Sequence, residues 1–453
     1  MKLESRSLAL IAEALERLEN GFSELPAIDT DYDIEALRSI LLDVAERLQD
    51  NYPYFHPYYA GQMLKPPHPI ARIAYILSLW INPNNHALDG GRASSFMEKE
   101  AVAEIAKLFG WNSFLGHLCG GGTMANLEAL WVSERLKPGM TVVASEQAHY
   151  THQRISEVLG LSFQAVSCDS QARMDIDALE RVLETGNVGT VVATIGTTGT
   201  GSVDPLSEIL VLKEKYGFRL HADAAYGGYF ILADNLNTST REAYNCLSQV
   251  DSIVIDPHKH GLQPYGCGCI LFKDPGVGKF YQHDSPYTYF SSSELHLGEI
   301  SLECSRPGAS AVALWATQKL LPLARGGEFA SGLSKSRKAA LWLYDKLSHD
   351  SRFKTILNPE LDIVVWAPKA ERASSVSRLS HEVFKVAASH NLHLAIFNYP
   401  TKLLNETWSD VIPDQDYVTC LRSCLMKPEH IDWIVPIWEI LDEVTNKVIG
   451  NRM

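Results

Sequence analysis

The sequence predicts an α/β fold with a large domain on a mostly parallel sheet, a smaller C-terminal α+β domain and an N-terminal helical arm. In the middle of the chain, short apolar runs rich in β-branched residues alternate with amphipathic helical segments. That alternation is typical of a parallel sheet with both faces covered by helices. Two helical segments precede this region, and strand patterns return between helices after it. At 453 residues, the chain also exceeds the usual size of a single domain.

The N-terminal part, residues 1–85, reads as a helical arm followed by a loop. Apolar residues recur at helical spacing in two stretches, 3–24 and 33–50. Two helices cannot bury their apolar faces on each other alone, so we expect the arm to pack on the rest of the chain or on a second subunit. The loop after the arm is rich in aromatic residues and proline, and we expect Tyr58 and Tyr59 to contribute to a substrate pocket.

The central part, residues 86–330, is predicted to hold the main sheet. Its expected strands are 141–147, 163–168, 190–196, 219–225, 252–257 and 269–272. Helical patterns separate most of them, for example at 176–184 and 206–216. Ligands of such sheets bind beyond the carboxyl ends of the strands. Polar residues directly after these strands are therefore candidates for a functional site.

The C-terminal part, residues 331–453, is predicted to form the smaller domain. Long helices are expected over 309–347, where the two domains join. The expected strands of the smaller domain are 361–368, 393–399 and 417–426. A helix over 428–448 closes it.

Composition excludes several classes of partner. The chain has 40 Lys and Arg against 54 Asp and Glu, a net charge of −14, and no basic block, so we expect neither a nucleic acid nor an anionic membrane as partner. The most apolar segment, 70–81, is too short to span a bilayer, and residues 1–25 do not read as a signal peptide. The eight cysteines show no zinc-binding spacing. We therefore expect a cytoplasmic protein with free thiols and no metal site.

The stretch SIVIDPHKHG, residues 252–261, places Lys259 between His258 and His260 at the end of an expected strand. Such a lysine is either a salt-bridge partner or a nucleophile. Burial beside other cations favours the neutral amine, which can attack a carbonyl group.

Three other loops carry candidate groups, and each also has an ordinary explanation. In CGGGTMANLEAL, residues 119–130, Gly122 and Thr123 precede a helix whose free N–H groups could hold a phosphate, although glycine also serves plain turns. His149 follows a strand, where a lone histidine is commonly structural. Asp223 ends another strand among small residues, and it needs a cation or strong donor unless it caps a helix.

Together these groups point to one cofactor. A phosphate cradle, a histidine, a buried aspartate and a reactive lysine at one sheet edge are what pyridoxal phosphate requires. Lys259 would form the Schiff base, and Asp223 would pair with the pyridinium nitrogen. Asp256 and His258 are close enough in sequence to Lys259 to contact the phosphate region.

The same motifs resemble those of the group II pyridoxal-phosphate-dependent amino-acid decarboxylases, which include the aromatic-L-amino-acid, tyrosine, glutamate and cysteine-sulfinate decarboxylases. The matching text is GGTMANLEAL, EQAH, ATIGTTGTGSVDP, HADAAYGG, DPHKHG and LECSRPGA, in the family's order, and the resemblance runs from about residue 50 to the end. It implies a fold type I homodimer with a shared active site, the cofactor pyridoxal 5'-phosphate and a small amino acid as substrate. The implied reaction releases carbon dioxide and gives the amine.

The resemblance assigns roles around the cofactor ring. It makes Lys259 the Schiff-base lysine and Asp223 the partner of the ring nitrogen. His149 would stack on the ring, and Ala225 would press on its other face. Thr198 would support the ring region.

It also assigns the phosphate and substrate contacts. Gly122 and Thr123 would bind the phosphate, with Asp256 and His258 helping. Arg422 in CLRSCL would receive the substrate α-carboxylate. The apolar Leu421 and the polar Ser423 on either side of it also fit an arginine on a half-exposed surface strand.

The polar, turn-rich segment 283–299 is expected to form a mobile lid over the site. In the family, a tyrosine on a comparable loop of the partner subunit delivers a proton to the substrate carbon, and the aldehyde synthases have phenylalanine there. The segment offers Tyr287 and Tyr289 beside Phe290. Because two of these three residues carry a hydroxyl, we expect the amine product.

Alternatives stay open at this point. Asp256 stands where several family members have asparagine, and His260 stands where the aromatic-specific enzymes tend to have tryptophan, so the substrate is not carried over. The sphingosine-phosphate lyases share the lysine motif and an SRPG-like string, so a carbon–carbon lyase is one rival. An oxidative aldehyde synthase is a second. A non-catalytic protein that binds a cofactor or nucleotide is a third.

Overall fold

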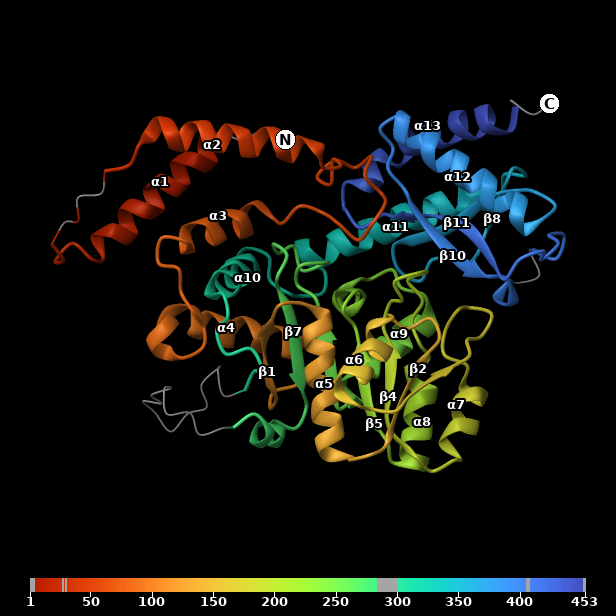
Figure 1. The fold of residues 1–453 in the computed structure, drawn as a ribbon, viewed down its shortest axis with the longest axis horizontal. Helices are drawn as coiled ribbons and strands as arrows, with labels where there is room; N and C mark the ends of the chain where they lie inside the picture. The colour runs from red at the N-terminus through yellow and green to blue at the C-terminus, as the bar shows by residue number, and fades with distance from the viewer. Residues whose placement is uncertain (1–4, 27, 29–30, 283–299, 405–407, 451–453) are drawn as a thin grey trace.

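Two sheets organise the computed structural model, which describes residues 5–26, 28, 31–282, 300–404 and 408–450 (Figure 1). The first sheet has seven strands in the order β1-β7-β6-β5-β4-β2-β3. Their bounds are β1 Leu115–Cys119, β2 Thr141–Ser145, β3 Phe163–Val166, β4 Val188–Thr194, β5 Arg219–Asp223, β6 Ser252–Ile255 and β7 Gly268–Phe272. The run from β6 to β3 is parallel, and β7 is antiparallel to both of its neighbours. The predicted, mostly parallel sheet is confirmed.

The predicted strands form because their apolar runs can be buried on both faces. All seven residues of β4 are buried, and so are all the residues of β6 and β7. The edge strand β1 was not predicted, because Gly116 and His117 interrupt its short apolar pattern. It is held by antiparallel pairing with β7.

Helices surround this sheet. Those between its strands are α5 Gly122–Leu136, α6 Thr151–Leu159, α7 Ile176–Leu183, α8 Leu206–Tyr216 and α9 Thr238–Asn245. Beside it, helix α10 Gly308–Leu320 packs against both α3 Pro69–Ser78 and α4 Leu88–Leu108. Short 3₁₀ turns lie at Leu48–Asp50, Gly228–Leu232, Leu247–Gln249, Pro275–Phe280 and Thr401–Leu403.

The second sheet has four antiparallel strands in the order β10-β11-β9-β8. They are β8 Phe353–Thr355, β9 Ile363–Pro368, β10 Ala395–Pro400 and β11 Tyr417–Cys424, and three of the four were predicted. The strand β8 has only three residues, which is too few for an alternation of apolar and polar residues to mark it in the sequence. Helices α11 Glu328–Ser348, α12 Ala373–Ser389 and α13 His430–Gly450 pack around this sheet.

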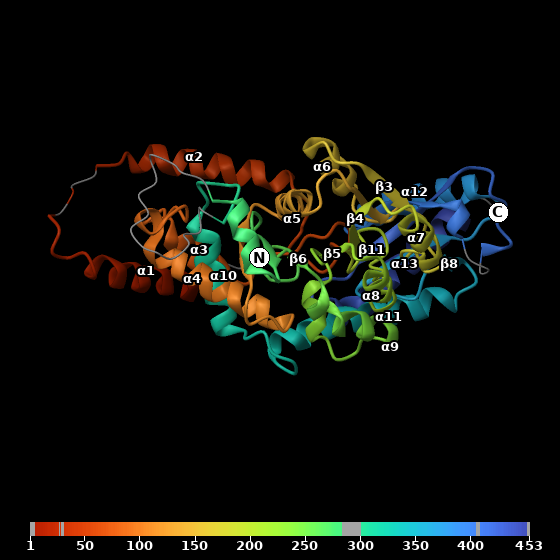
Figure 2. The same ribbon diagram turned by 90° about the horizontal axis from the view of Figure 1, so that it is seen from below.

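The N-terminal arm consists of α1 Ser5–Asn20 and α2 Ile34–Arg47, as the sequence predicts. It projects along one end of the molecule, with α1 near α3 (Figures 1 and 2). None of the residues of α2 is buried, although it carries a row of large apolar side chains. Leu41, for example, is 69% exposed. Among the described residues, none packs on the apolar side chains of α2 closely enough to bury them.

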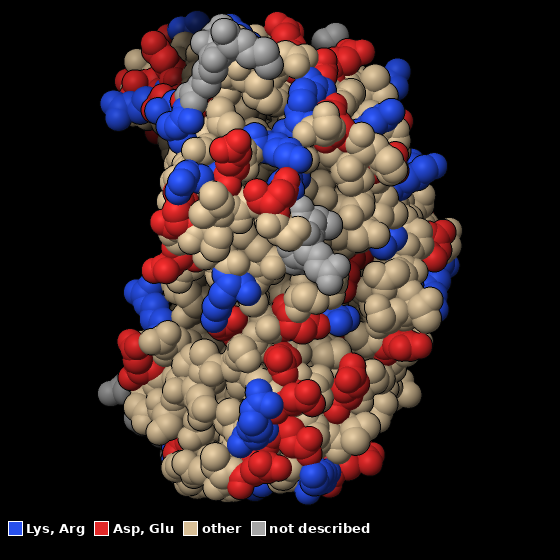
Figure 3. All heavy atoms as spheres, turned by 90° about the vertical axis from the view of Figure 1, so that its right-hand side faces the viewer, with Lys and Arg blue, Asp and Glu red and all other residues tan. Residues whose placement is uncertain are grey.

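The outer surface carries mixed charge. Figure 3 shows acidic and basic side chains interspersed on the side that carries β8 in Figure 1. Among the ion pairs of the described residues, Asp410 pairs with Lys354 and Lys369. Arg352 pairs with Asp350. Among the described helices, none combines the length and the apolar character that a membrane crossing needs.

Candidate active site

Helix α5 begins directly after β1, and its N-terminus faces the segment that follows β6. A Cβ atom on Gly122 would lie 2.9 Å from Oδ2 of Asp256 and 3.3 Å from Cβ of Ala225. One on Gly121 would lie 3.1 Å from Cε1 of His258. Glycine at these positions lets the backbone approach closely, and no side chain caps the helix. Free N–H groups at a positive helix end are a phosphate-binding arrangement.

Lys259 lies in the turn after β6 and is paired with Asp256. Its Nζ is 3.0 Å from Oδ2 of Asp256, and Nε2 of His258 is 3.5 Å from the same oxygen. The backbone N–H of Lys259 also donates to the carbonyl of Asp256. The structure therefore shows the salt bridge that the sequence allowed. Oδ1 of Asp256 is buried and has no hydrogen-bond partner among the described residues.

Asp223 ends β5 in a buried network. Its Oδ2 lies 2.8 Å from Nε2 of His152 on α6 and accepts a hydrogen bond from Nδ2 of Asn126 on α5 at 3.2 Å. The backbone N–H of Ala225 donates to Oδ1 at 3.2 Å. Burial alone would raise the pKa of Asp223, but the hydrogen bond and charge of His152 hold it well below its usual range. Asp223 is therefore an ionised carboxylate inside the protein.

A second histidine fixes the orientation of Asn126. Nε2 of His221 lies 2.8 Å from Oδ1 of Asn126, and Nδ1 lies 2.8 Å from the hydroxyl of Ser252. Burial lowers the pKa of His221 to about 3, so its ring is neutral at pH 7. Nε2–H then donates to Asn126, Nδ1 accepts from Ser252, and the amide group of Asn126 is left to donate to Asp223.

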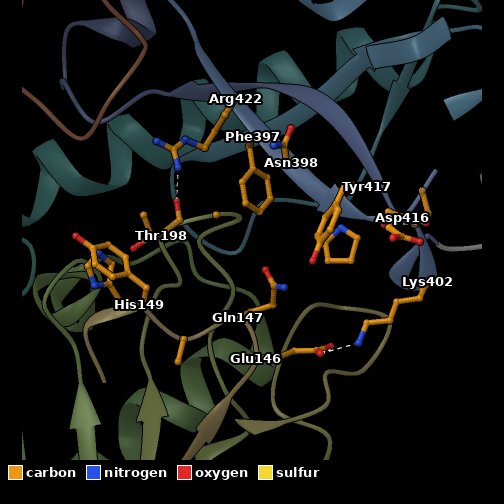
Figure 4. Close-up of a pocket in the computed structure, with 15 residues that line it drawn as sticks. Glu146, Gln147, His149, Thr198, Phe397, Asn398, Lys402, Asp416, Tyr417 and Arg422 are labelled. Carbon is orange, nitrogen blue, oxygen red and sulfur yellow. Dashed lines mark hydrogen bonds and ion pairs between the residues drawn. The ribbon is translucent and has the colours of Figure 1, made fainter. Parts of the chain in front are cut away.

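Arg422 and His149 line a cavity of about 670 Å³ between the two sheets (Figure 4). Nη1 of Arg422 donates to the backbone carbonyl of Thr198 at 2.7 Å, and Nη2 donates to Oε1 of Gln62 at 2.8 Å. Arg422 is only 6% exposed, which contradicts a surface-strand arginine. Its Nε is buried without a partner among the described residues, and each Nη has a second N–H beyond the one used here, so the guanidinium can bind a further acceptor.

The imidazole of His149 is held at the opposite wall of this cavity. Its Nδ1 lies 2.8 Å from Oγ1 of Thr151. Burial lowers its pKa, against the opposing effect of Asp223, so the ring is neutral at pH 7. The cavity is lined by Glu146, Gln147, Ala148, His149, Tyr150, Thr198, Gly199, Phe397, Asn398, Pro400, Thr401, Lys402, Asp416, Tyr417 and Arg422.

The other predicted site residues lie as follows. Thr123 is exposed in the first turn of α5. Tyr58 packs edge-on against Trp433, and Tyr59 is buried in a β-bridge to His393, so neither lines the cavity. Tyr287 and Tyr289 lie outside the described residues.

Sequence reasoning did not assign Asn126, His152 or His221 to the network of Asp223, nor Gln62 to the contacts of Arg422. Asn126 stands inside the glycine-rich motif, and His152 stands one helical turn after His149, so spacing offered a weak signal for both. Gln62 stands in the loop where tyrosines were expected to act, and no local pattern marks it. Among the described residues, no group of three or more His, Cys, Asp or Glu side chains could hold a metal ion.

The arrangement fits pyridoxal phosphate. The uncapped N-terminus of α5 suits its phosphate, the ionised Asp223 suits a protonated ring nitrogen, and the Lys259 amine lies beside the glycine loop. These features sit on an α/β fold with a mostly parallel sheet and a second antiparallel sheet. Together they define a pyridoxal-phosphate-dependent enzyme of fold type I.

Comparison with known proteins identifies the family. Residues 123–369 match the pyridoxal-dependent decarboxylase conserved domain. An L-tyrosine decarboxylase of Enterococcus faecium is 27% identical, with 75% of this chain and 74% of that protein covered. An L-aspartate decarboxylase of Thermococcus kodakarensis is 29% identical, with 72% and 83% covered. The crystal structure of Oryza sativa TDC with PLP and tryptamine has a TM-score of 0.77 at 16% identity and 99% coverage of both chains, which shows the fold.

This chain belongs to the pyridoxal-phosphate-dependent amino-acid decarboxylase family. It is a carboxy-lyase that uses pyridoxal phosphate and a small amino-acid substrate. The predictions of fold class, cofactor and reaction class are confirmed.

Proposed function

We propose that this chain removes the α-carboxyl group of an L-amino acid and forms the amine, with the residues named above as its active site. The observation that supports the proposal best is the ionised, buried carboxylate of Asp223, at the same sheet edge as Lys259. A charge in that position is costly unless it serves a partner. Pyridoxal phosphate, when bound, supplies an electron sink for the bond-breaking step.

Around the ring, each residue has one task. Asp223 keeps a proton on the ring nitrogen, and His152 keeps Asp223 charged. Lys259 would hold the cofactor through its amine. His149 and Ala225 would contact the two faces of the ring, and Thr198 would support its edge.

At the phosphate, the N–H groups of Gly122 and Thr123 are proposed as donors, with His258 beside them. Asp256 is better suited to another task, because its carboxylate would repel an anion. Its 3.0 Å contact with Nζ of Lys259 supports a role in holding that amine.

Arg422 is proposed to bind the substrate α-carboxylate. The 2.7 Å and 2.8 Å hydrogen bonds to Thr198 and Gln62 keep its guanidinium in place, and the remaining N–H groups of Nη1 and Nη2 can donate to a carboxylate oxygen. Charge-assisted hydrogen bonds of this kind fix both position and direction. Tyr58 and Tyr59 would influence substrate binding indirectly, by supporting the loop that carries Gln62.

Release of carbon dioxide from candidate substrates tests the proposal. The screen covers the twenty common amino acids with dopa and cysteine sulfinate, and it begins with tyrosine and aspartate because relatives carry those names. At least one amino acid should give carbon dioxide and an equal amount of amine, and Lys259→Ala should give neither. Aldehyde in place of amine would point to an oxidative synthase, and no release with any substrate would contradict the proposal.

We also propose a homodimer in which the two subunits share their active sites. The exposed apolar row of α2 supports it, because a face that this chain leaves open suits a second copy. Tyr287 or Tyr289 of one subunit would then serve the other. Sedimentation analysis should give twice the mass of the chain, and Leu41→Glu should shift the protein toward the monomer.

The remaining proposals concern organisation and location. We propose three parts: an arm and loop over 1–85, a large cofactor-binding domain over 86–330 and a small domain over 331–453. The separate sheets support the last boundary. A cytoplasmic location is supported by the eight cysteines, all of which are free.

A further inference from the structure

A buried carboxylate with no task in the chemistry above connects the two sheets. Asp362 lies directly before β9, and its side chain is inaccessible to solvent. Its Oδ1 accepts a hydrogen bond from the hydroxyl of Tyr226 at 2.6 Å. Its Oδ2 lies 3.3 Å from Nε2 of His260, in contact with the ring but without the geometry of a hydrogen bond. Both partners come from loops that follow strands of the seven-stranded sheet.

The positions of these partners in the chain make the contact relevant to the active site. Tyr226 directly follows Ala225, and His260 directly follows Lys259. On the other side, β9 pairs with β11 so that Val365 lies opposite Arg422. Asp362 therefore stands between the two segments expected to contact the cofactor and the strand expected to bind the substrate.

Close packing holds the segment around Asp362 in place. A Cβ atom on Gly196 would lie only 2.8 Å from Cδ1 of Leu361. Oε2 of Glu360 accepts a hydrogen bond from the backbone N–H of Val203 at 2.7 Å. Because of these contacts, Asp362 cannot shift unless the loop around Thr198 shifts with it.

The ring of His260 is also fixed. It meets Tyr226 and Phe230 edge-on, at centroid distances of 4.8 and 4.9 Å. Such edge-to-face packing is the favoured arrangement of aromatic rings. The ring thus presents Nε2 to the carboxylate and has little room to turn.

The charges around Asp362 are few. Burial raises its pKa to about 6, opposed by the hydrogen bond of Tyr226 and the charge of Lys65. Burial lowers the pKa of His260 far below its usual value and that of Lys65 to about 8. At pH 7, Asp362 is mostly a carboxylate that accepts a hydrogen bond from Tyr226, experiences the charge of Lys65 and lies beside the neutral ring of His260. Burial of such a group costs free energy, so a role other than stability would explain its presence.

We propose that Asp362 is a positioning residue that holds Tyr226 and His260, and with them the segments of Ala225 and Lys259, in register with the strand of Arg422. This inference rests on the proposed roles of Lys259 and Arg422. Asp362 itself does not touch the reacting atoms. Its effect is on alignment, which a catalytic site needs to within a fraction of an ångström.

Two variants of the holoenzyme test the inference. Asp362→Ala removes both contacts, and kcat should fall at least tenfold while KM changes less than threefold, because alignment and not binding is lost. Asp362→Asn keeps an oxygen for the Tyr226 hydroxyl and should recover most of kcat. The visible circular dichroism of bound pyridoxal phosphate should change in Asp362→Ala and return toward wild type in Asp362→Asn, because the band reports how the ring sits in its surroundings.

Asp251→Asn is the matched control. Asp251 precedes β6 at the opposite end of the strands, accepts a hydrogen bond from the N–H of Leu220 at 2.7 Å and pairs with Lys213 at 2.8 Å. Its loss should lower Tm but leave kcat and the dichroism of the cofactor unchanged. If Asp362→Ala keeps kcat within twofold and leaves the dichroism unchanged, the inference is overturned.

Tyr226→Phe covers the case in which Asp362→Ala does not fold. It removes the hydrogen bond to Oδ1 of Asp362, so it should lower kcat and change the dichroism of the cofactor, whereas Asp362→Asn, which keeps the acceptor oxygen, should stay near wild type. Wild-type kcat and dichroism in Tyr226→Phe would overturn the inference. If the wild type binds pyridoxal phosphate but releases no carbon dioxide, the proposed reaction fails instead. The dichroism of the Asp362 variants then decides the inference alone, with a changed band in its favour and an unchanged band against it.

Discussion

Nε2 of His152 lies 2.8 Å from Oδ2 of Asp223, and both side chains are almost fully shielded from solvent. This contact joins α6 to the end of β5, and with Asn126 it supplies the donors that a buried carboxylate requires. Burial alone would raise the pKa of Asp223, but this contact lowers it, so Asp223 stays negatively charged at neutral pH at the proposed cofactor site.

The first prediction concerns this charge. Asp223→Asn removes it and should raise the barrier by at least about 3 kcal/mol, on the order of a hundredfold in kcat. His152→Phe leaves the hydrogen bonds from Asn126 and Ala225, so its kcat should fall less, by roughly tenfold. Gln153→Ala, an exposed neighbour on α6, serves as control and should behave as wild type. Near-normal turnover of Asp223→Asn would refute its role at the ring nitrogen.

The second prediction concerns Lys259. Borohydride reduction of the holoenzyme should attach the cofactor to this residue, because its amine lies beside the glycine loop and Asp256. Mass spectrometry of a digest locates the adduct. Lys259→Ala should give no adduct, whereas Lys273→Ala, after β7, should give the wild-type one. An adduct on any other lysine would show that Lys259 was assigned wrongly.

The third prediction concerns Arg422. Lysine at this position keeps the charge, but its single nitrogen cannot replace the two separate nitrogens that donate to Thr198 and Gln62 and also hold a carboxylate in the planar, bidentate manner of arginine. Arg422→Lys should therefore raise KM about tenfold or more with a smaller effect on kcat. The exposed Arg372→Lys provides the control. An unchanged KM would mean that Arg422 only braces the cavity wall.

The fourth prediction concerns the fate of the product. One of the two lid tyrosines is proposed to donate the proton. Replacing that tyrosine with phenylalanine should convert part of the amine yield into aldehyde, which forms with oxygen. Amine, aldehyde and peroxide are measured for Tyr287→Phe and Tyr289→Phe, with and without oxygen. If both variants keep the full amine yield, neither tyrosine is the donor, and His149 is the next residue to test.

The fifth prediction concerns stability and pH. Burial, together with the charge of Lys65, lowers the pKa of Lys427 to about 7. The unfolded chain has the ordinary, higher pKa, so above pH 7 it binds a proton that the folded protein lacks. The free energy of unfolding should therefore rise with pH from this site, by at most about 1.4 kcal/mol per pH unit.

Lys427→Met should lose that contribution. Denaturant unfolding at pH 7, 8 and 9 gives the free energy of unfolding of wild type and variant. The difference between the two values should grow with pH. The exposed Lys447→Met should keep the wild-type slope. Parallel curves for wild type and Lys427→Met would show that Lys427 keeps its ordinary pKa in the folded protein.

The sequence alone determined the class of fold, the cofactor and the reaction class. Strands such as β4 and β6 are continuous apolar runs, and a parallel sheet brings their carboxyl ends to one edge. Asp223 is the last residue of β5 and Lys259 lies in the turn after β6, so their chemistry could be predicted from local position. The hydrogen bonds of these residues could not be read in the same way.

Only the tertiary structure decided those partners. Asn126 and His152 lie 97 and 71 residues before Asp223, and Gln62 lies 360 residues before Arg422. No local period encodes such pairs, because they form only when separate elements pack together. The same holds for Asp362, whose contacts with Tyr226 and His260 join two sheets. Local patterns place a side chain at a strand end, but the packing of distant elements decides which donor or acceptor it meets.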